Sequence, residues 1–172
     1  VEGGRLLSDD ISRLDCLYEA GVRFLTLVWN KTCKIGGAHG SDEGLTDFGR
    51  EVVLRCFELG IIPDVSHASV KMTSEVLELC EASGKVCVAT HSNSHTVCAH
   101  RRNLDDASFK RIAKLGGIVG VSLAPNHLTS GDKCTIDDIV AHIEHYLSLG
   151  GGDTVCLGCD LDRVRHLPQG IG

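Results

Sequence analysis

Short apolar runs alternate with amphipathic stretches along this chain, and that alternation constrains its fold more than any other feature. The apolar runs, which we expect to be strands, cover residues 22–29, 61–66, 86–90, 118–123 and 154–158. Between them, apolar side chains recur at helical spacing, which predicts helices near 9–20, 46–60, 69–82, 105–115 and 135–149. Strands that alternate with helices pair in parallel through right-handed crossovers. The sequence therefore predicts an α/β fold with a parallel sheet.

The number of strands narrows the fold class further. Val1-Glu2-Gly3-Gly4 has the pattern of a strand end and its turn, which adds a sixth strand before Gly3. Six parallel strands fit a TIM-like (β/α)8 barrel, present here as a partial barrel of about six β/α units that lacks its first strands. A doubly wound open sheet is the alternative, although no glycine-rich phosphate loop follows any strand. We expect no targeting signal to be readable from this N-terminus.

Composition and charge argue against two classes of partner. The chain has 172 residues, 42% of them hydrophobic, and a formal net charge of −6. A nucleic-acid-binding protein needs a basic face, so we expect no nucleic-acid partner. No apolar run approaches the roughly 20 residues of a membrane-spanning helix, so no membrane segment is visible.

The nine cysteines indicate reduced thiols rather than a disulfide scaffold. Their number is odd, and they lie in predicted strands and helices instead of loops. Cys156 and Cys159 have the spacing of a C-x-x-C motif, but residues three apart on a strand point to opposite faces. We interpret this pair as packing residues and expect a cytoplasmic protein with buried thiols.

Polar side chains stand where the predicted strands end. They are Glu2, Trp29, His67, His91 and Asp160. The carboxyl ends of parallel strands open onto one face, where such folds carry their chemistry. Two carboxylates and two imidazoles on one face suit a divalent metal of the zinc class. A single histidine is more often a surface or hydrogen-bonded core residue, but several polar groups at successive strand ends are harder to explain in that way.

Most of the remaining histidines are better explained as surface or hydrogen-bonded core residues. His142 and His145 are expected on the polar face of a helix, and His39 and His166 in loops. His95, His100 and His127 are near the expected mouth, as outer groups around the metal ligands. Two arginines, Arg101 and Arg102, follow His91 in a loop on the same face. They are either a solvated pair or a clamp for a carboxylate.

Taken together, these motifs resemble those of the renal (membrane) dipeptidase family, zinc-dependent dipeptidases of the amidohydrolase-like barrel type. The resemblance runs from the first residue to about Asp162, and the joint order of its motifs makes it specific. The motifs are Val1-Glu-Gly-Gly4, Leu25-Thr-Leu27, Gly44-Leu-Thr-Asp-Phe-Gly49, Asp64-Val-Ser-His67, Thr90-His-Ser92, Arg101-Arg-Asn103 and Gly158-Cys-Asp-Leu-Asp162.

The resemblance implies a role for each candidate residue. Glu2 is similar to the carboxylate that bridges two zinc ions, and His67 and His91 to the ligands that complete the second metal. Arg102 is similar to the group that binds the substrate carboxylate, and Asp160 to the catalytic acid/base. A hydroxide shared by two zinc ions is a nucleophile at neutral pH, and the metals polarise the scissile carbonyl. Asp160 would move the proton from water to the leaving amine.

Three departures from the family pattern concern the same site. The His-x-Asp pair that holds the family's first metal upstream of the bridging glutamate is absent from this chain. Trp29 stands where the family often has a substrate-binding histidine, although its indole N–H can still donate one hydrogen bond. Arg163 replaces the glycine that usually follows the last strand.

We therefore expect one metallo-dipeptidase barrel domain over residues 1–172, incomplete at its N-terminus and at its C-terminus. Two Zn²⁺ ions are expected in the complete protein, with a dipeptide as substrate; a homodimer is left open. One alternative is another metal-dependent amidohydrolase on the same scaffold. Arg102 distinguishes it from a dipeptidase, because a dipeptide needs a group that binds its carboxylate. Another is a truncated or inactive homologue that lacks the first metal site.

Overall fold

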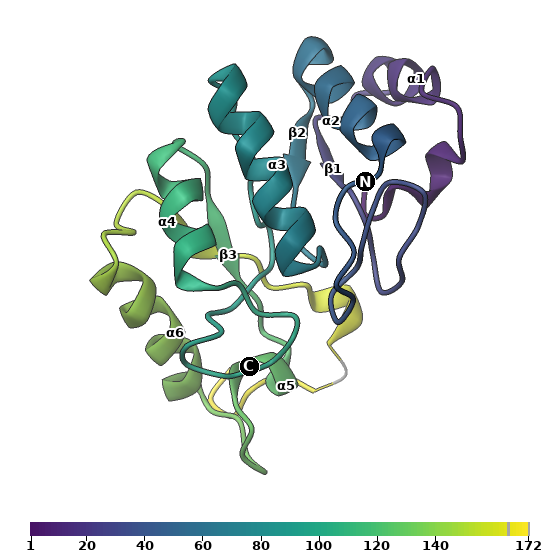
Figure 1. Ribbon diagram of the computed structural model, residues 1–172. Coiled ribbons are helices and arrows are strands. Elements are labelled where there is room, and N and C mark those ends of the chain that lie inside the picture. Colours follow the sequence, from purple (N-terminus) through teal and green to yellow (C-terminus); the bar gives the residue numbers. More distant parts are fainter. Residues whose placement is uncertain (165, 172) are drawn as a thin grey trace. The chain divides into compact units, whose positions relative to one another are not determined.

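The structure, a computed structural model, describes residues 1–164 and 166–171, and the Arg163 side chain lies outside this description. The chain divides into a first unit, Val1–Val88, and a second unit, Ala89–Gly172. Figure 1 shows the elements of both units along the sequence, from purple to yellow. Among the described residues, no helix is both long enough and apolar enough to cross a membrane.

The strands of the first unit pair in parallel and in sequence order. β1 (Phe24–Thr26) pairs with β2 (Ile62–Asp64), so that Leu25 lies opposite Pro63. Glu2 extends this arrangement by a parallel bridge to Thr26, and Val88 extends it by a parallel bridge to Asp64. The direction and order of pairing are therefore those that the sequence predicts.

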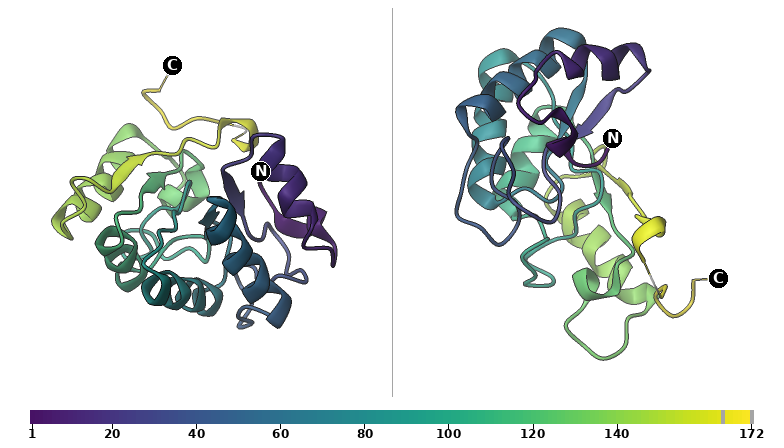
Figure 2. Two further views of the ribbon diagram at one scale, coloured as in Figure 1. Left: turned by 90° about the horizontal axis from the view of Figure 1, so that it is seen from above. Right: turned by 90° about the vertical axis from the view of Figure 1, so that its right-hand side faces the viewer.

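The helices of the first unit are η1 (Gly4–Leu7), α1 (Arg13–Glu19), α2 (Asp47–Leu59) and α3 (Val70–Ser83). Thr46 and Ser69 cap α2 and α3, since each hydroxyl accepts a hydrogen bond from the backbone N–H three residues later in the chain. Both helices end at a glycine in the left-handed conformation. Seen from above, α1, α2 and α3 line one side of this unit's strands (Figure 2).

The first helix begins later than predicted. We expected a helix over residues 9–20 capped by Ser8 or Asp9, whereas α1 starts at Arg13 after η1 and a series of turns. The Asp10 carboxylate accepts hydrogen bonds from the backbone N–H and the hydroxyl of Ser12, at 3.0 and 2.6 Å. Such local bonds satisfy the backbone without a helix and so compete with it.

The second unit also has parallel strands, β3 (Val119–Val121) and β4 (Val155–Leu157), and Ala89 bridges to Val119 in the same sense. Its helices are α4 (Asp106–Lys114), α5 (Pro125–Leu128), α6 (Ile136–Ser148) and η2 (Leu161–Arg163). α4 and α6 pack together through stacked rings of Phe109 and Tyr146, whose centroids are 4.1 Å apart. The short helix α5 was not predicted, and the expected strand 86–90 is reduced to single bridges at Val88 and Ala89.

The buried face of α6 differs from the predicted one. Thr135 and Asp138 form the expected capping box. Of the apolar residues that recur at helical spacing in α6, Ile139 is buried, but Ile136, Val140 and Leu147 are 42–48% exposed. His142 and Tyr146 are buried instead. In β4, Cys156 and Leu157 are exposed.

The nine cysteines differ in exposure. Four of the nine are buried, as predicted: Cys56, Cys80, Cys87 and Cys98. Burial raises the pKa of the Cys56 thiol to about 12, which keeps this sulfur protonated and unreactive. Cys156, in contrast, is exposed, so its interpretation as a packing residue was wrong.

The architecture is thus mixed α/β with parallel strands joined through helices, in agreement with the predicted class. Within each unit the parallel strands form an open arrangement, and among the described residues no sheet closes on itself.

Candidate metal and substrate site

A carboxylate and an imidazole meet in the first unit. Glu2 Oε1 lies 3.1 Å from His67 Nε2. The His67 side chain is buried, with 6% of its surface exposed, and that of Glu2 is 32% exposed. Two ligands that each bind one zinc at 2.0–2.1 Å in tetrahedral geometry lie roughly 3.3 Å apart. The donor types and their separation therefore fit a shared metal ion.

Backbone conformation places His67 after β2. The residue has φ 69°, in the left-handed region that non-glycine residues rarely adopt. Its carbonyl oxygen accepts a hydrogen bond of 2.7 Å from the backbone N–H of His39. Strained residues of this kind are found where surrounding structure imposes them, often at functional sites.

Asp64, which stands in the motif Asp64-Val-Ser-His67 but was given no role of its own, fixes the turn before His67. Its carboxylate is buried and accepts hydrogen bonds from the Thr26 hydroxyl at 2.6 Å and from the Ser66 backbone N–H at 2.9 Å. The first bond joins β2 to β1, and the second orients the chain beyond the strand. The signal available in the sequence was a carboxylate inside an apolar strand, since unpaired burial of such a group is costly.

Two aromatic rings flank His67. The Trp29 and His67 ring centroids are 6.2 Å apart, and those of His39 and His67 are 5.8 Å apart. Trp29 therefore lies beside the proposed ligand, as predicted from its strand-end position. His39 was assigned to a loop without a role. The signal for it was the glycine-rich loop 30–44, which is too long for a simple connection.

In the second unit, His91 and Arg102 lie together. His91 is 9% exposed and Arg102 is 7% exposed. Thr90 Oγ1 is 2.8 Å from His91 Nδ1, within hydrogen-bond distance. Arg102 Nη2 donates to the His91 carbonyl oxygen at 3.4 Å. Arg101 is exposed, so Arg102 is the buried member of the arginine pair.

Two glycines let the strands of this unit approach Thr90 closely. A Cβ atom would lie 2.0 Å from the Thr90 carbonyl oxygen at Gly120, and 1.8 Å from it at Gly158. Any side chain at either position would push this segment away. The glycines therefore help to set the position of His91.

Side-chain amides hold the loop that connects His91 to Arg102. Asn93 pairs with Ser122 in both directions, accepting from its backbone N–H at 2.7 Å and donating to its carbonyl oxygen at 3.2 Å. Asn103 Nδ2 donates to the carbonyl oxygens of Ser94, Cys98 and His127, at 3.3, 2.8 and 2.8 Å.

His142 is part of this support, and its assignment to a polar helix face was wrong. The ring is fully buried; Nδ1 accepts a hydrogen bond from the Ser94 backbone N–H, and Nε2 lies 2.9 Å from the Leu128 carbonyl oxygen. One nitrogen faces a donor and the other an acceptor, which selects the neutral ring with its proton on Nε2. Burial lowers the pKa of His142, so the ring stays neutral. Its neighbour His145 is half-buried and bonds to Asp106 at 2.9 Å.

Asp160 follows β4 in the second unit. It has φ 56° and ψ 40°, in the left-handed region, and its side chain is half-buried. Two further histidines of this unit, His100 and His127, have ring centroids 4.7 Å apart. Burial and the charges of Arg101 and Arg102 lower the pKa of His100. The catalytic role of Asp160 stays a prediction.

The structure thus brings Glu2, Trp29 and His67 together in one unit, and His91 and Arg102 together in the other. Their roles as metal ligands and substrate-binding groups stay predictions.

Comparison with known proteins identifies relatives over the whole chain. The family model described as membrane dipeptidase (peptidase family M19) matches residues 1–172. A dipeptidase described as a metallopeptidase of family M19 is 31% identical, with a TM-score of 0.91, over 99% of this chain and 53% of its own. A metallopeptidase from Rhodobacter sphaeroides, solved with a phosphinate mimic of the dipeptide L-Ala-D-Ala, is 32% identical, with a TM-score of 0.89. It is matched over 99% of this chain and 51% of its own.

An amidohydrolase from Pseudomonas aeruginosa is 30% identical, with a TM-score of 0.84, over 99% of this chain and 50% of its own. The chain therefore spans about half the length of these solved structures.

Proposed function

This chain belongs to the membrane dipeptidase family, peptidase family M19, and from that premise we propose that the protein hydrolyses dipeptides with bound zinc. The observation that carries the proposal is the contact between the Glu2 carboxylate and the buried His67 imidazole. We further propose that the parallel strands of both units belong to one (β/α)8 barrel domain. Family membership and the TM-scores of its relatives support that assignment.

We assign Glu2, His67 and His91 as metal ligands. Carboxylate oxygen and imidazole nitrogen are ligands that zinc prefers. When bound, zinc makes water a nucleophile at neutral pH and polarises the scissile carbonyl. The hydrogen-bond distance between Thr90 Oγ1 and His91 Nδ1 supports Nε2 as the ligating nitrogen, because a second partner on the ring orients a metal-binding histidine.

The other candidate residues bind the substrate and transfer a proton from the attacking water to the leaving amine. Arg102 is buried and its guanidinium presents paired donors that match a carboxylate, so we assign it to the C-terminal carboxylate of the dipeptide. Trp29 can donate one hydrogen bond to the substrate through its indole N–H. We assign Asp160 as the acid/base that takes the proton of the attacking water and passes it to the leaving amine.

The first test is an assay of the full-length protein with zinc against a panel of dipeptides that includes L-Ala-D-Ala. We expect turnover that His91→Ala abolishes, with a loss of bound zinc by elemental analysis. His166→Ala, which changes an exposed histidine of the same unit, should keep wild-type activity and metal content. Equal turnover by wild type and His91→Ala would contradict the assignment.

One observation favours a second candidate, hydrolysis of another amide or ester. Trp29 stands where the family often has a substrate-binding histidine. Arg102→Ala decides between the two, because only a dipeptide needs its carboxylate bound. We expect a rise in KM for dipeptides of at least about tenfold, the value of one charged hydrogen bond. Arg101→Ala, at the exposed neighbour, is the matched control. An unchanged KM in Arg102→Ala would support the second candidate.

A further inference from the structure

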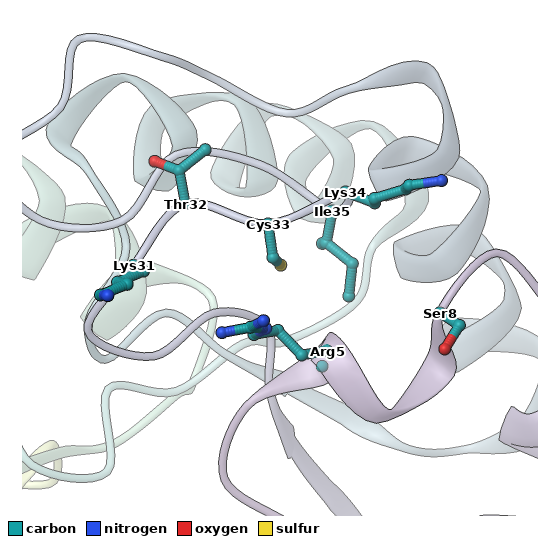
Figure 3. Close-up of a pocket in the computed structure, with 8 residues that line it drawn as sticks. Arg5, Ser8, Lys31, Thr32, Cys33, Lys34 and Ile35 are labelled. Carbon is teal, nitrogen blue, oxygen red and sulfur yellow. The ribbon is translucent and has the colours of Figure 1, made fainter.

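A pocket of about 360 Å³ in the first unit collects basic side chains. It lies between the turn that follows Glu2 and the loop that follows Trp29, and its charged lining residues are Arg5, Lys31 and Lys34. Figure 3 shows Arg5 extending beneath the loop, with Cys33 pointing from the loop toward the turn. The lining contains no acidic residue, although the chain as a whole has a net charge of −6.

Two of these three cations have no counterion in the part of the chain that the structure describes. Lys34 pairs with Asp9. The side chains of Arg5 and Lys31 are exposed, and neither has a hydrogen-bond or ion-pair partner among the described residues. Two unpaired cations at one concave surface attract an anion and raise its local concentration.

The pocket adjoins the residues of the proposed site that belong to this unit. The backbone N–H groups of Gly3 and Gly4 donate to the carbonyl oxygens of Thr26 and Leu27, at 3.0 and 3.2 Å. The segments that lead to Arg5 and to Lys31 therefore leave neighbouring parallel strands at the same edge. Arg5 follows Glu2 by three positions, and Lys31 follows Trp29 by two. An anion in this pocket would be close to a substrate held beside Glu2 and Trp29.

The volume and the chemistry point to a small carboxylate. Ligand pockets usually measure about 300–1,000 Å³, so this one has room for a side chain rather than for a large cofactor. A guanidinium binds a carboxylate through two parallel hydrogen bonds, and a lysine adds a second charge. We propose that this pocket is a subsite for the side-chain carboxylate of an aspartate or glutamate in the dipeptide. This proposal rests on the proposed function.

The test compares acidic dipeptides with their neutral isosteres on the full-length protein with zinc. The pairs are Asp-Ala with Asn-Ala, Glu-Ala with Gln-Ala, Ala-Asp with Ala-Asn, and Ala-Glu with Ala-Gln. We expect kcat/KM to favour the acidic member of at least one pair by about tenfold or more, the value of one charged hydrogen bond. The pair that responds identifies which residue of the dipeptide enters the pocket.

Variants of the two unpaired cations connect that preference to the pocket. In the double variant Arg5→Ala/Lys31→Ala the ratio of acidic to neutral kcat/KM should fall to near one, and in Arg5→Glu below one. The control Arg50→Ala/Lys71→Ala, two exposed cations of the same unit outside the pocket, should keep the wild-type ratio. The proposal is overturned if neutral dipeptides are as good as acidic ones, or if the preference survives in the double variant.

A binding measurement separates failure of the subsite from failure of the proposed function. N-acetyl-aspartate α-amide carries only the side-chain carboxylate, and N-acetyl-asparagine α-amide is its neutral control. Calorimetry should detect binding of the first to wild type and a loss in Arg5→Ala/Lys31→Ala. If no dipeptide is hydrolysed, the function and the substrate assignment both fall, while this binding still shows whether the pocket takes a carboxylate. Without binding, the pocket assignment falls as well.

Discussion

The two histidines proposed as metal ligands are held in place by different kinds of interaction. His67, in the first unit, depends on its own left-handed backbone and on the turn that Asp64 fixes directly before it. His91, in the second unit, begins a loop that is secured by side chains distant in sequence. His142 of α6 accepts from the Ser94 backbone, and the Tyr146 hydroxyl donates to the Ser92 carbonyl oxygen at 3.1 Å.

This difference determines which substitutions should disturb each half of the site. The turn at His67 is held by the Ser66 backbone, by Thr26 of β1 and by the loop that carries His39, and these partners lie outside the helices. A loop fixed by buried side chains of a helix moves when that helix is altered, since buried polar groups left without partners are costly. We therefore expect substitutions in the helices of the second unit to change the positions of His91 and Arg102. Substitutions in the helices of the first unit should leave the position of His67 unchanged.

The largest effect is expected for His142→Ala. The substitution leaves the Ser94 N–H and the Leu128 carbonyl without their partner and opens a cavity in the core. We expect the free energy of unfolding to fall by about 3–5 kcal/mol in urea denaturation. Amide hydrogen exchange should accelerate in residues 91–103 and stay unchanged in residues 64–67. His145→Ala, at the half-buried neighbour on the same helix, should cost less than about 1 kcal/mol. Equal losses in the two variants would contradict the role of His142.

A smaller effect is expected at Asn103, whose amide holds three carbonyl oxygens. Asn103→Ala removes the donors, and we expect a loss of about 2–3 kcal/mol in the free energy of unfolding. Asn103→Asp should be worse, because an ionised carboxylate has only acceptors to present to the same three oxygens. Asn126→Ala, at an exposed position of this unit, is the control and should be neutral. If Asp were tolerated better than Ala, the assigned orientation of the Asn103 amide would be wrong.

Glycine substitutions compare the two histidines directly. His67 has φ 69°, where alanine costs about 1 kcal/mol more than glycine, so His67→Gly should be more stable than His67→Ala. His91 does not have a positive φ. There His91→Gly should be less stable than His91→Ala, by about 0.5–1 kcal/mol, because glycine loses more freedom on folding. Thermal or urea unfolding of the four variants checks the sign at each position. The same sign at both would contradict the difference in how they are held.

The features that the sequence predicts correctly are those with local causes. Thr46, Ser69 and Asp105 cap α2, α3 and α4 close to the helix starts that the sequence predicts, because a cap needs only its own hydroxyl or carboxylate and a backbone N–H three residues on. The parallel order of the strands follows from the alternation of strands and helices. The meeting of Glu2 and His67, from strand ends on either side of β1, agrees with the expectation that the carboxyl ends of parallel strands open onto one face.

The failures have causes outside the local sequence. Apolar spacing cannot show that the polar ring of His142 is buried, because its partners come from residues 94 and 128. The apolar run of β4 does not show which of its faces is covered, so the exposure of Cys156 was missed. Location in the cytoplasm, a homodimer and the extent of the barrel domain remain predictions, because the contacts within the described residues do not test them.

The smallest expected effect is a dependence of stability on pH through His142. The pKa of the folded ring is lowered by burial, whereas Asp138 and the Leu128 carbonyl raise it and His145 lowers it. The unfolded chain, with an ordinary histidine pKa near 6.5, therefore binds more protons than the folded chain in the interval below that value. The stabilisation is present above about pH 6.5 and is lost as the pH falls through the folded pKa. Protonation would place an N–H on Nδ1 against the Ser94 N–H, which is one reason why protonating this ring in the folded chain is unfavourable.

Urea denaturation between pH 5 and 8 of wild type and His142→Gln, both in the presence of a chelator, measures this contribution. Glutamine does not titrate, so His142→Gln should lose less stability than wild type on acidification. His145→Gln, whose histidine bonds to Asp106 at a half-exposed position, serves as the control for the other ionisable ring of α6. Acid-induced loss of equal size in wild type and His142→Gln would mean that the buried ring is not the group that titrates. Because the ring holds the Ser94 backbone, wild-type hydrogen exchange in residues 91–103 should rise on acidification before exchange in residues 64–67 does.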